Sequence, residues 1–402
     1  MSKDVFVTGL GMVSAIGQNV EETLVSLQEL KTGLGNVHHL RTIHRNLPCG
    51  EVSLSDVALR EILQIPADEE ITRTSLLGIL AAKEAYLSAE VGRCKTLGLR
   101  IGFLNGTTVG GMERSEQYYL DFINPESNEY TAYINAHDCG YTTEKIADYL
   151  DKFDFVSTIS TACSSAVNTL IHAVNMLQAG YIDCVIAGGS ECLTKFHLNG
   201  FRTLMILDEQ PCRPFDETRA GLNLGEGAAY LVLETEKSLK LRNRKAICKI
   251  TGWGNSCDAY HQTASSPNGK GAVLSMNAAL SMANLKPQDI DYINAHGTGT
   301  PNNDESEGMA IMEVFKEKIP PISSTKSYTG HTTSASGSVE AVISILAMKH
   351  GFLPVNLNFK HPMSQLSFSP IYKMHKNGNI KHVLNNSFGF GGNNSSIIFS
   401  TL

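Results

Sequence analysis

The chain has 402 residues, of which 42% are hydrophobic and 18% charged, and its formal net charge is −7. These values exclude a disordered chain, and the lack of any block of positive charge argues against a nucleic-acid-binding protein. The chain exceeds the usual size of a single domain, so two domains or one large layered α/β unit are expected.

The N-terminal stretch MSKDVFVTGLGMVSAIG does not have the pattern of a signal peptide, because only Lys3 is basic and glycines soon interrupt the apolar run. No apolar run is long enough to span a bilayer, so we expect a cytoplasmic protein without a membrane span. The nine cysteines are scattered and form no Cys-x-x-Cys pair. Most are therefore expected to be small buried hydrophobes, and no metal site is predicted.

Patterns typical of strands and helices alternate along the chain. In the first part, strands are predicted at residues 4–11, 100–108, 155–161 and 183–191, and helices at 19–33, 73–90, 142–151 and 164–180. In the second part, strands are predicted at 247–258, 290–300 and 382–400, and helices at 271–285, 304–315 and 338–351. The alternation predicts largely parallel sheets covered by helices, in two similar halves at residues 1–245 and 246–402.

Cys163 lies in STACSSA, between a predicted strand and the start of a predicted helix. The N-terminus of a helix favours negative charge, which would lower the pKa of this thiol and make it a nucleophile. The alternative is a buried structural cysteine. The local residues support these two interpretations about equally.

Three further stretches carry candidate functional residues. His296 ends an apolar strand in NAHGTGT, Lys326 and His331 share the polar loop SSTKSYTGH, and Phe390 lies among glycines in NSFGFGGNN. A histidine at the carboxyl end of a parallel strand lies where α/β proteins bind ligands. The alternatives are that the histidines are structural, that Lys326 is a solvated loop lysine, and that the Phe390 ring only anchors a turn.

Taken together, these motifs resemble the β-ketoacyl-acyl-carrier-protein synthases (type I/II) of the thiolase-like superfamily. The resemblance runs from end to end, through VTGLGMVSAIG, STACSSA, AGGSE, RPFD, GEGAA, NAHGTGTPNND, SSTKSYTGH and NSFGFGGNN. It implies an α/β, five-layer αβαβα sandwich and a homodimer or a heterodimer with a related ketosynthase-like chain. The implied reaction is a decarboxylative Claisen condensation that elongates a fatty acid or a polyketide such as a polyene.

The resemblance also implies a role for each candidate. Cys163 would hold the acyl chain, His296 and His331 would bind the malonyl thioester, and the backbone N–H groups of Cys163 and Phe390 would form the oxyanion hole. Phe390 would also gate the acyl pocket, and Lys326, paired with Glu307, would position the two histidines. Thr298 and Thr300 would contact the phosphopantetheine arm. Val109 would lie at the far end of the acyl pocket. Acyl carrier protein would deliver the substrates, with no other cofactor.

Other family members fit less well. Degradative thiolases use a second cysteine near the C-terminus, and here the last cysteine is Cys257. The remaining alternative is a non-condensing subunit that supports a catalytic partner. Asn223 and Asn393 depart from the family pattern, and His38, His39 and His44 are expected in a solvated loop rather than at a metal. The candidates for a basic carrier-protein surface are Arg45, Arg60, Arg73, Lys195 and Arg202.

Overall fold

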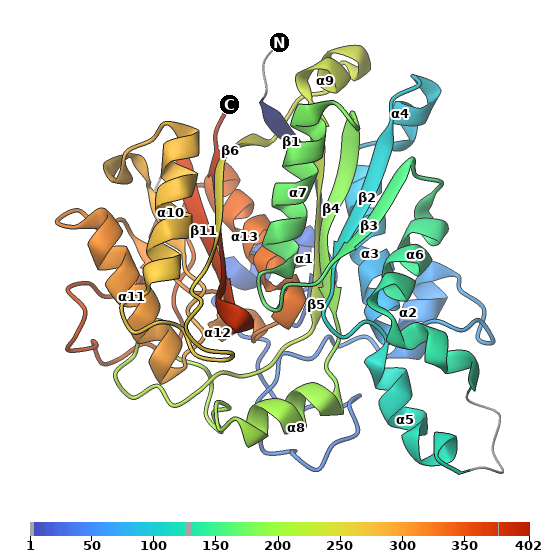
Figure 1. Cartoon of the computed structure of the whole chain (residues 1–402), viewed down its shortest axis with the longest axis horizontal. Helices are drawn as coiled ribbons and strands as arrows, with labels where there is room; N and C mark the ends of the chain where they lie inside the picture. Colours follow the sequence, from blue (N-terminus) through green and yellow to red (C-terminus); the bar gives the residue numbers. More distant parts are fainter. Residues whose placement is uncertain (1–3, 125–130, 377) are drawn as a thin grey trace.

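The computed structural model describes residues 4–124, 131–376 and 378–402. Its framework is a ten-stranded sheet in the order β3-β2-β4-β5-β1-β6-β12-β11-β7-β8 (Figure 1). Five strands come from the first half of the chain: β1 (Val5–Ser14), β2 (Ile101–Gly106), β3 (Phe155–Ile159), β4 (Cys184–Glu191) and β5 (Gly227–Thr235). Five come from the second: β6 (Cys248–Cys257), β7 (Tyr292–Asn294), β8 (Ile322–Ser323), β11 (His382–Gly389) and β12 (Asn393–Ser400). The strand order of one half is thus mirrored in the other.

The sheet is mixed rather than largely parallel, which corrects the expectation from the alternating pattern. Strand β2 is parallel to β3 and β4, and β7 is parallel to β8 and β11. The strands nearest the centre, β5, β1, β6 and β12, pair antiparallel. Sequence periodicity does not distinguish these cases, because a strand buried on both faces has the same apolar run in either direction.

The two halves meet where β1 pairs with β6, at Val5 opposite Ile250 and Val7 opposite Cys248. Two helices, α7 (Ser165–Ala179) and α13 (Ser336–His350), lie between the halves and contact strands of both. Helices α3 (Arg73–Ser88) and α6 (Cys139–Leu150) cover the outside of the first half, and α10 (Lys270–Ala283) and α11 (Pro301–Phe315) that of the second. The five-layer αβαβα sandwich is therefore confirmed; the division of the chain near residue 245 stays a prediction.

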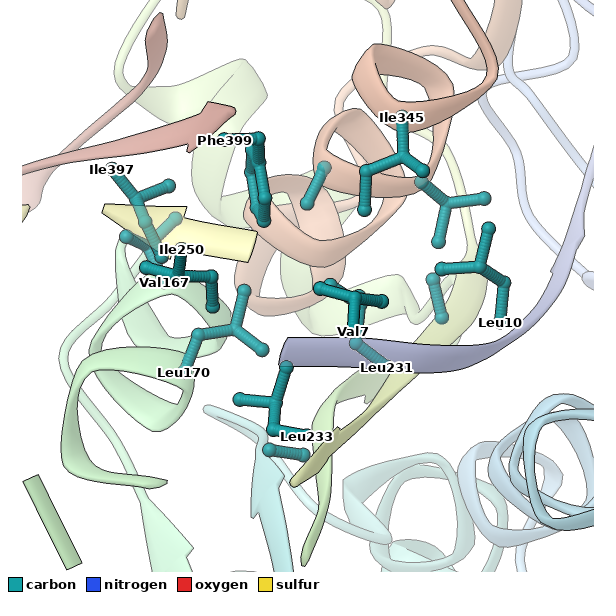
Figure 2. Packing of buried hydrophobic residues seen from close by; sticks show 14 of the residues in the cluster. Val7, Leu10, Val167, Leu170, Leu231, Leu233, Ile250, Ile345, Ile397 and Phe399 are labelled. Atoms are coloured by element: carbon teal, nitrogen blue, oxygen red, sulfur yellow. The ribbon is translucent and has the colours of Figure 1, made fainter. Parts of the chain in front are cut away.

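The largest core cluster fills the space around these two central helices. Side chains of β1, β5, β6 and β12 meet those of α7 and α13, as at Val7, Val167, Ile345 and Phe399 (Figure 2). Burying each such side chain contributes roughly 1.5–3 kcal/mol. Because α13 packs between strands of the two halves, every residue from Ser336 to Ala347 is buried, Glu340 included.

Shorter elements complete the fold. The remaining α-helices are α1 (Val20–Gln28), α2 (Asp56–Leu63), α4 (Gly92–Thr96), α5 (Met112–Phe122), α8 (Lys195–Thr203), α9 (Glu236–Arg242) and α12 (Lys326–Thr329). The 3-10 helices are η1 (Thr131–His137), η2 (Pro287–Asp289), η3 (Thr333–Ala335) and η4 (Phe390–Gly392), and β9 (Phe352–Leu353) pairs with β10 (His375–Lys376). Within the described ranges, no helix combines the length and the apolar character that crossing a membrane requires.

Candidate active site

Cys163, His296 and His331 come together between the two halves of the molecule. The sulfur of Cys163 and a ring nitrogen of each histidine all lie within 4.8 Å of one another. Nε2 of His331 is 3.2 Å from the Cys163 sulfur, and the two imidazole rings meet edge to face with centroids 5.3 Å apart. Cys163 lies more than a hundred positions before the two histidines in the chain, yet the three side chains form one cluster.

Cys163 is held in a tight turn between β3 and α7. Ala162 adopts a left-handed conformation with φ 53°, which an alanine rarely does without support from its surroundings. That support comes from Ser165, whose hydroxyl accepts a hydrogen bond from the Thr161 N–H at 2.9 Å and donates to the Ala162 carbonyl at 2.6 Å. The Cys163 carbonyl accepts a hydrogen bond from the Ser387 hydroxyl at 2.9 Å. The turn thus fixes the thiol against both halves.

The thiol does not have the lowered pKa expected from its place at a helix N-terminus. Burial raises the pKa of Cys163 to about 11, although the Lys326 cation and the backbone N–H groups of Phe390 and Cys163 act in the opposite direction. Only 7% of this residue is exposed, so loss of water around the thiolate outweighs the helix dipole. At neutral pH the resting group is the neutral thiol.

Two backbone N–H groups point at the sulfur, those of Cys163 itself and of Phe390. The close approach of the η4 turn depends on Gly389, because a Cβ there would lie 3.0 Å from the Cys163 nitrogen. Two converging N–H groups beside a nucleophile form the arrangement that stabilises an oxyanion. The positions of Cys163 and Phe390 are therefore compatible with their predicted roles.

His331 is held through its ring and through its backbone. Its Nδ1 lies 2.8 Å from the Ser336 hydroxyl at the start of α13, and its backbone N–H donates to the Asn223 carbonyl at 2.7 Å. Burial lowers the pKa of His331 well below its usual value, and the Lys326 cation lowers it further. The imidazole is therefore neutral at pH 7. Ser336 was not predicted, and only its place in a small-residue loop could have suggested it.

Lys326 sets the state of His296. Its Nζ lies 3.2 Å from His296 Nδ1 and 2.6 Å from the His296 carbonyl oxygen. An amine that donates to Nδ1 leaves the ring proton of a neutral imidazole on Nε2, the nitrogen that faces the cavity. Burial and the Lys326 cation lower the pKa of His296 well below its usual value, so this tautomer is neutral.

Lys326 pairs with Glu340, not with Glu307 as predicted. The Lys326 ammonium contacts the Glu340 carboxylate inside α13, and both side chains are 2% exposed. Glu307 instead accepts the backbone N–H groups of His296 at 2.9 Å and Gly297 at 2.7 Å. Burial raises the pKa of each carboxyl group to about 7. Glu340 was missed, although an acidic residue inside the apolar run SVEAVISILAM was a usable signal.

The spacing of Cys163, His296 and His331 is also that of a metal site, but their chemistry does not fit one. A metal ligand must offer a lone pair, whereas Lys326 at Nδ1 leaves His296 with a proton on the Nε2 that faces the cluster. The loop histidines do not converge either: Nε2 of His39 contacts the Ser53 carbonyl, and Nε2 of His44 contacts Asn199.

A cavity of about 340 Å³ opens onto Cys163. Thr298 and Thr300 line it and share a hydrogen bond at 2.8 Å. Phe390 also lines the cavity and stacks on Phe201 of α8, with ring centroids 5.6 Å apart. Val109 is buried but is not among the residues that line this cavity.

The predicted basic residues divide into three groups. Arg45 and Lys195 are exposed and line one surface hollow together with Arg41. Arg73 is wrong as a surface candidate, because it is 7% exposed and bound to Glu226 at 2.6 Å. Two others have partners on their own surface: Arg60 donates to two backbone carbonyls, and Arg202 pairs with Glu209.

Comparison with known proteins assigns the whole chain. Residues 2–238 match the model of the beta-ketoacyl synthase N-terminal domain, and residues 247–360 match that of the C-terminal domain. The chain is 31% identical over 408 residues to a 3-oxoacyl-(acyl-carrier-protein) synthase 2 of Staphylococcus aureus, covering 99% of this chain and 98% of the relative. A protein of the same name from Vibrio harveyi is 29% identical over 412 residues, with 99% and 98% covered.

Solved structures agree with the sequence relatives. The ishigamide ketosynthase/chain length factor superposes with a TM-score of 0.92 at 28% identity, covering 99% of each chain. A ketosynthase in complex with its chain length factor from Xenorhabdus doucetiae gives 0.85 at 28% identity, covering 99% of this chain and 98% of that one. The similarity extends over the full length of both chains.

Proposed function

Because the chain belongs to the beta-ketoacyl synthase family, it is a condensing enzyme, and we propose that Cys163, His296 and His331 carry out its reaction. The reaction joins an acyl group to a two-carbon unit from malonyl-acyl-carrier protein and releases carbon dioxide. The observation that carries the residue assignment is the convergence of His331 Nε2 and two backbone N–H groups on the Cys163 sulfur.

The first step loads the enzyme. The Cys163 sulfur attacks the acyl thioester, a new S–C bond forms, and the pantetheine sulfur leaves. The thiol proton must reach that leaving sulfur. His331 Nε2, 3.2 Å from the Cys163 sulfur, is placed to transfer it, because the neutral ring can accept a proton.

The second step generates the carbon nucleophile. After loading, the neutral His331 ring takes the tautomer with its proton on Nε2, in which the Ser336 hydroxyl donates to Nδ1. The malonyl thioester carbonyl then accepts hydrogen bonds from Nε2 of His296 and of His331, and loss of carbon dioxide leaves its electron pair as an enolate. His296 is suited to this role, since Lys326 keeps its proton on Nε2. The enolate carbon then attacks the acyl carbonyl on Cys163. The N–H groups of Cys163 and Phe390 stabilise the resulting oxyanion, which collapses and releases the Cys163 thiolate. Uptake of one proton from water restores the neutral thiol.

The partners follow from the same assignment. The substrates travel on the phosphopantetheine of an acyl carrier protein, and Thr298 and Thr300 would contact that arm. We propose no metal or other cofactor, since loss of carbon dioxide drives the bond formation. The cytoplasm is the proposed location, on the sequence features given above.

A second ketosynthase-like chain or a second copy would pair along β3. This strand ends the sheet, and Val156 on it is 40% exposed. Two similar solved structures contain a ketosynthase with its chain length factor, which favours a related chain as the partner.

One assay tests the function. The purified protein, alone and with a candidate partner chain, is incubated with carrier protein loaded with an acyl group and carrier protein loaded with a malonyl group. The 3-ketoacyl product is then measured by mass spectrometry. Product from the native protein and none from Cys163→Ala supports the assignment. Equal product from both would overturn the role of Cys163, and product formed only by a partner's own cysteine would favour the supporting-subunit alternative.

A further inference from the structure

Asn223 has a buried amide that binds three groups of one loop. The residue is 2% exposed, and its Oδ1 accepts the Cys212 N–H at 2.6 Å. Its Nδ2 donates to the carbonyls of Asp208 at 3.0 Å and Gln210 at 3.2 Å. One side chain thus satisfies three backbone groups of residues 208–212, which have no regular secondary structure.

The backbone of the same residue binds a proposed catalytic histidine. The Asn223 carbonyl accepts the His331 N–H at 2.7 Å, and the Gly225 N–H donates to the His331 carbonyl at 2.9 Å. His331 is therefore paired with residues 223–225 as in a short parallel ladder, beside the Leu224–His331 bridge. A shift of Asn223 would move the ring that lies 3.2 Å from the Cys163 sulfur.

The loop bound by Asn223 leads to the other histidine. The Cys212 thiol donates to the Thr298 carbonyl at 3.2 Å, in the turn that follows His296. Burial raises the pKa of Cys212 to about 12, so this thiol keeps its proton and stays a donor. Asn223 therefore connects two separate parts of the cavity wall, His331 through its backbone and Thr298 through its side chain and Cys212.

We infer that Asn223 is a positioning residue for the malonyl half of the reaction. Decarboxylation needs His296, His331 and the bound pantetheine arm in one geometry, and Asn223 sets the distance between the loops that carry them. Acyl loading also uses His331 and the pantetheine arm, but it does not use His296, which precedes the turn that the Asn223 side chain reaches through Cys212. The inference rests on the proposed function and goes beyond it, because it makes one residue matter more to the second step than to the first.

The test separates the two half-reactions. Leucine at position 223 keeps the branched side-chain skeleton of asparagine but removes all three side-chain hydrogen bonds. For Asn223→Leu, we expect acylation of Cys163 within about twofold of the native rate. We expect malonyl decarboxylation to fall about tenfold to a hundredfold, with a raised KM for malonyl-carrier protein, as small misplacements of catalytic groups do.

Cys212 supplies the matched pair of variants. Cys212→Ser keeps a donor for the Thr298 carbonyl, so its decarboxylation rate should stay within about threefold of the native rate. Cys212→Ala removes that donor, so its decarboxylation rate should fall as in Asn223→Leu. These variants also keep the test decisive should Asn223→Leu fail to fold. Urea unfolding of every variant measures its stability separately.

Equal losses in both half-reactions, or unchanged decarboxylation in Asn223→Leu and Cys212→Ala, would overturn the inference. Failure of the native enzyme to load an acyl group on Cys163 is a different result, and it would overturn the proposed function together with the inference built on it. Native loading and condensation with no selective defect in the variants would overturn the positioning role alone.

Discussion

His331 Nε2 lies 3.2 Å from the sulfur of Cys163, and both groups are neutral at rest. Burial raises the pKa of the thiol to about 11 and lowers the pKa of the imidazole well below its usual value. A thiolate–imidazolium pair would have to be stabilised against the loss of water around two charges. The pair is therefore neutral at rest, and the proposed mechanism requires the proton to move once the substrate thioester is bound.

The first prediction concerns the pH dependence of loading. A depressed folded-state pKa keeps His331 neutral as the pH falls, so the rate of Cys163 acylation should show no acid limb near pH 6.5. Removing the Lys326 cation raises the pKa of His331, so the acid limb of the acylation rate should move toward pH 6.5. We expect this shift in a Lys326→Met, Glu340→Gln double variant, which leaves no unpaired buried charge. An acid limb near pH 6.5 in the native enzyme would contradict the prediction.

The second prediction concerns the reactivity of the thiol. Only the thiolate is alkylated, and with a pKa of about 11 its fraction rises about tenfold per pH unit up to that value. Alkylation of Cys163 by iodoacetamide, followed by peptide mass spectrometry, should therefore still accelerate between pH 9 and 10. Cys163→Ser identifies the contribution of the other cysteines. A rate that levels off below pH 8 would show a thiolate at rest.

The layers of the fold were predicted from the sequence, and so were the three side chains that the structure brings together, because they depend on local motifs and on an end-to-end resemblance. Cys163, His296 and His331 each follow or precede a regular element, so short patterns locate them. The neutral state of the thiol was not predicted. A helix N-terminus is visible in the sequence, whereas the desolvation that outweighs it depends on how completely two halves of the fold close over the cysteine.

The sequence also did not predict which charged side chains pair when the partners are far apart in the chain. Glu307 and Glu340 both lie on helices near Lys326; the apolar run around Glu340 indicates that it is buried but does not show that it meets the ammonium. Arg73 is similar: its helix position suggests a surface charge, but Glu226, distant in sequence, draws it into the interior. Such pairings are decided by tertiary packing.

The third prediction concerns the buried ion pair between Lys326 and Glu340. Glu340→Gln leaves Lys326 buried without its ion pair and should lower the free energy of unfolding by about 3–5 kcal/mol, as breaking buried pairs does. A double-mutant cycle with Lys326→Met should give an interaction energy of about 1–3 kcal/mol for Glu340. The same cycle with Glu307→Gln should give a clearly smaller value. A larger coupling to Glu307 than to Glu340 would restore the original assignment.

The fourth prediction concerns the ring pair above the cavity. Phe201 and Phe390 stack with an angle of 20° between their planes, which holds the Phe390 side chain at the cavity wall. Phe201→Ala and Phe390→Ala should each alter the rate at which acyl-carrier protein loads Cys163. The two changes should couple by about 0.5–1.5 kcal/mol, as paired aromatic rings do. Strictly additive effects in stopped-flow acylation would show that the rings act independently.

The fifth prediction concerns the surface that receives the carrier protein. Arg41, Arg45 and Lys195 line one hollow, and Ile43 beside it is 88% exposed, so this surface offers both charge and an apolar contact. Arg45→Glu and Lys195→Glu should each raise KM for an acidic carrier about fivefold at low salt, which corresponds to ~1 kcal/mol per charge, with kcat unchanged.

Lys240→Glu provides the control for this surface, because it reverses an exposed charge on α9, at the opposite end of the molecule from α8 (Figure 1). It should leave KM unchanged. Raising the salt concentration screens exposed charges, so the native KM should increase and approach the KM of the Arg45→Glu and Lys195→Glu variants. A native KM that does not respond to salt, or an equal effect of Lys240→Glu, would place the carrier elsewhere. The position of α8 favours the surface proposed here, since its Phe201 lines the cavity and its Lys195 lines the hollow, so a carrier seated there would be close to the entrance.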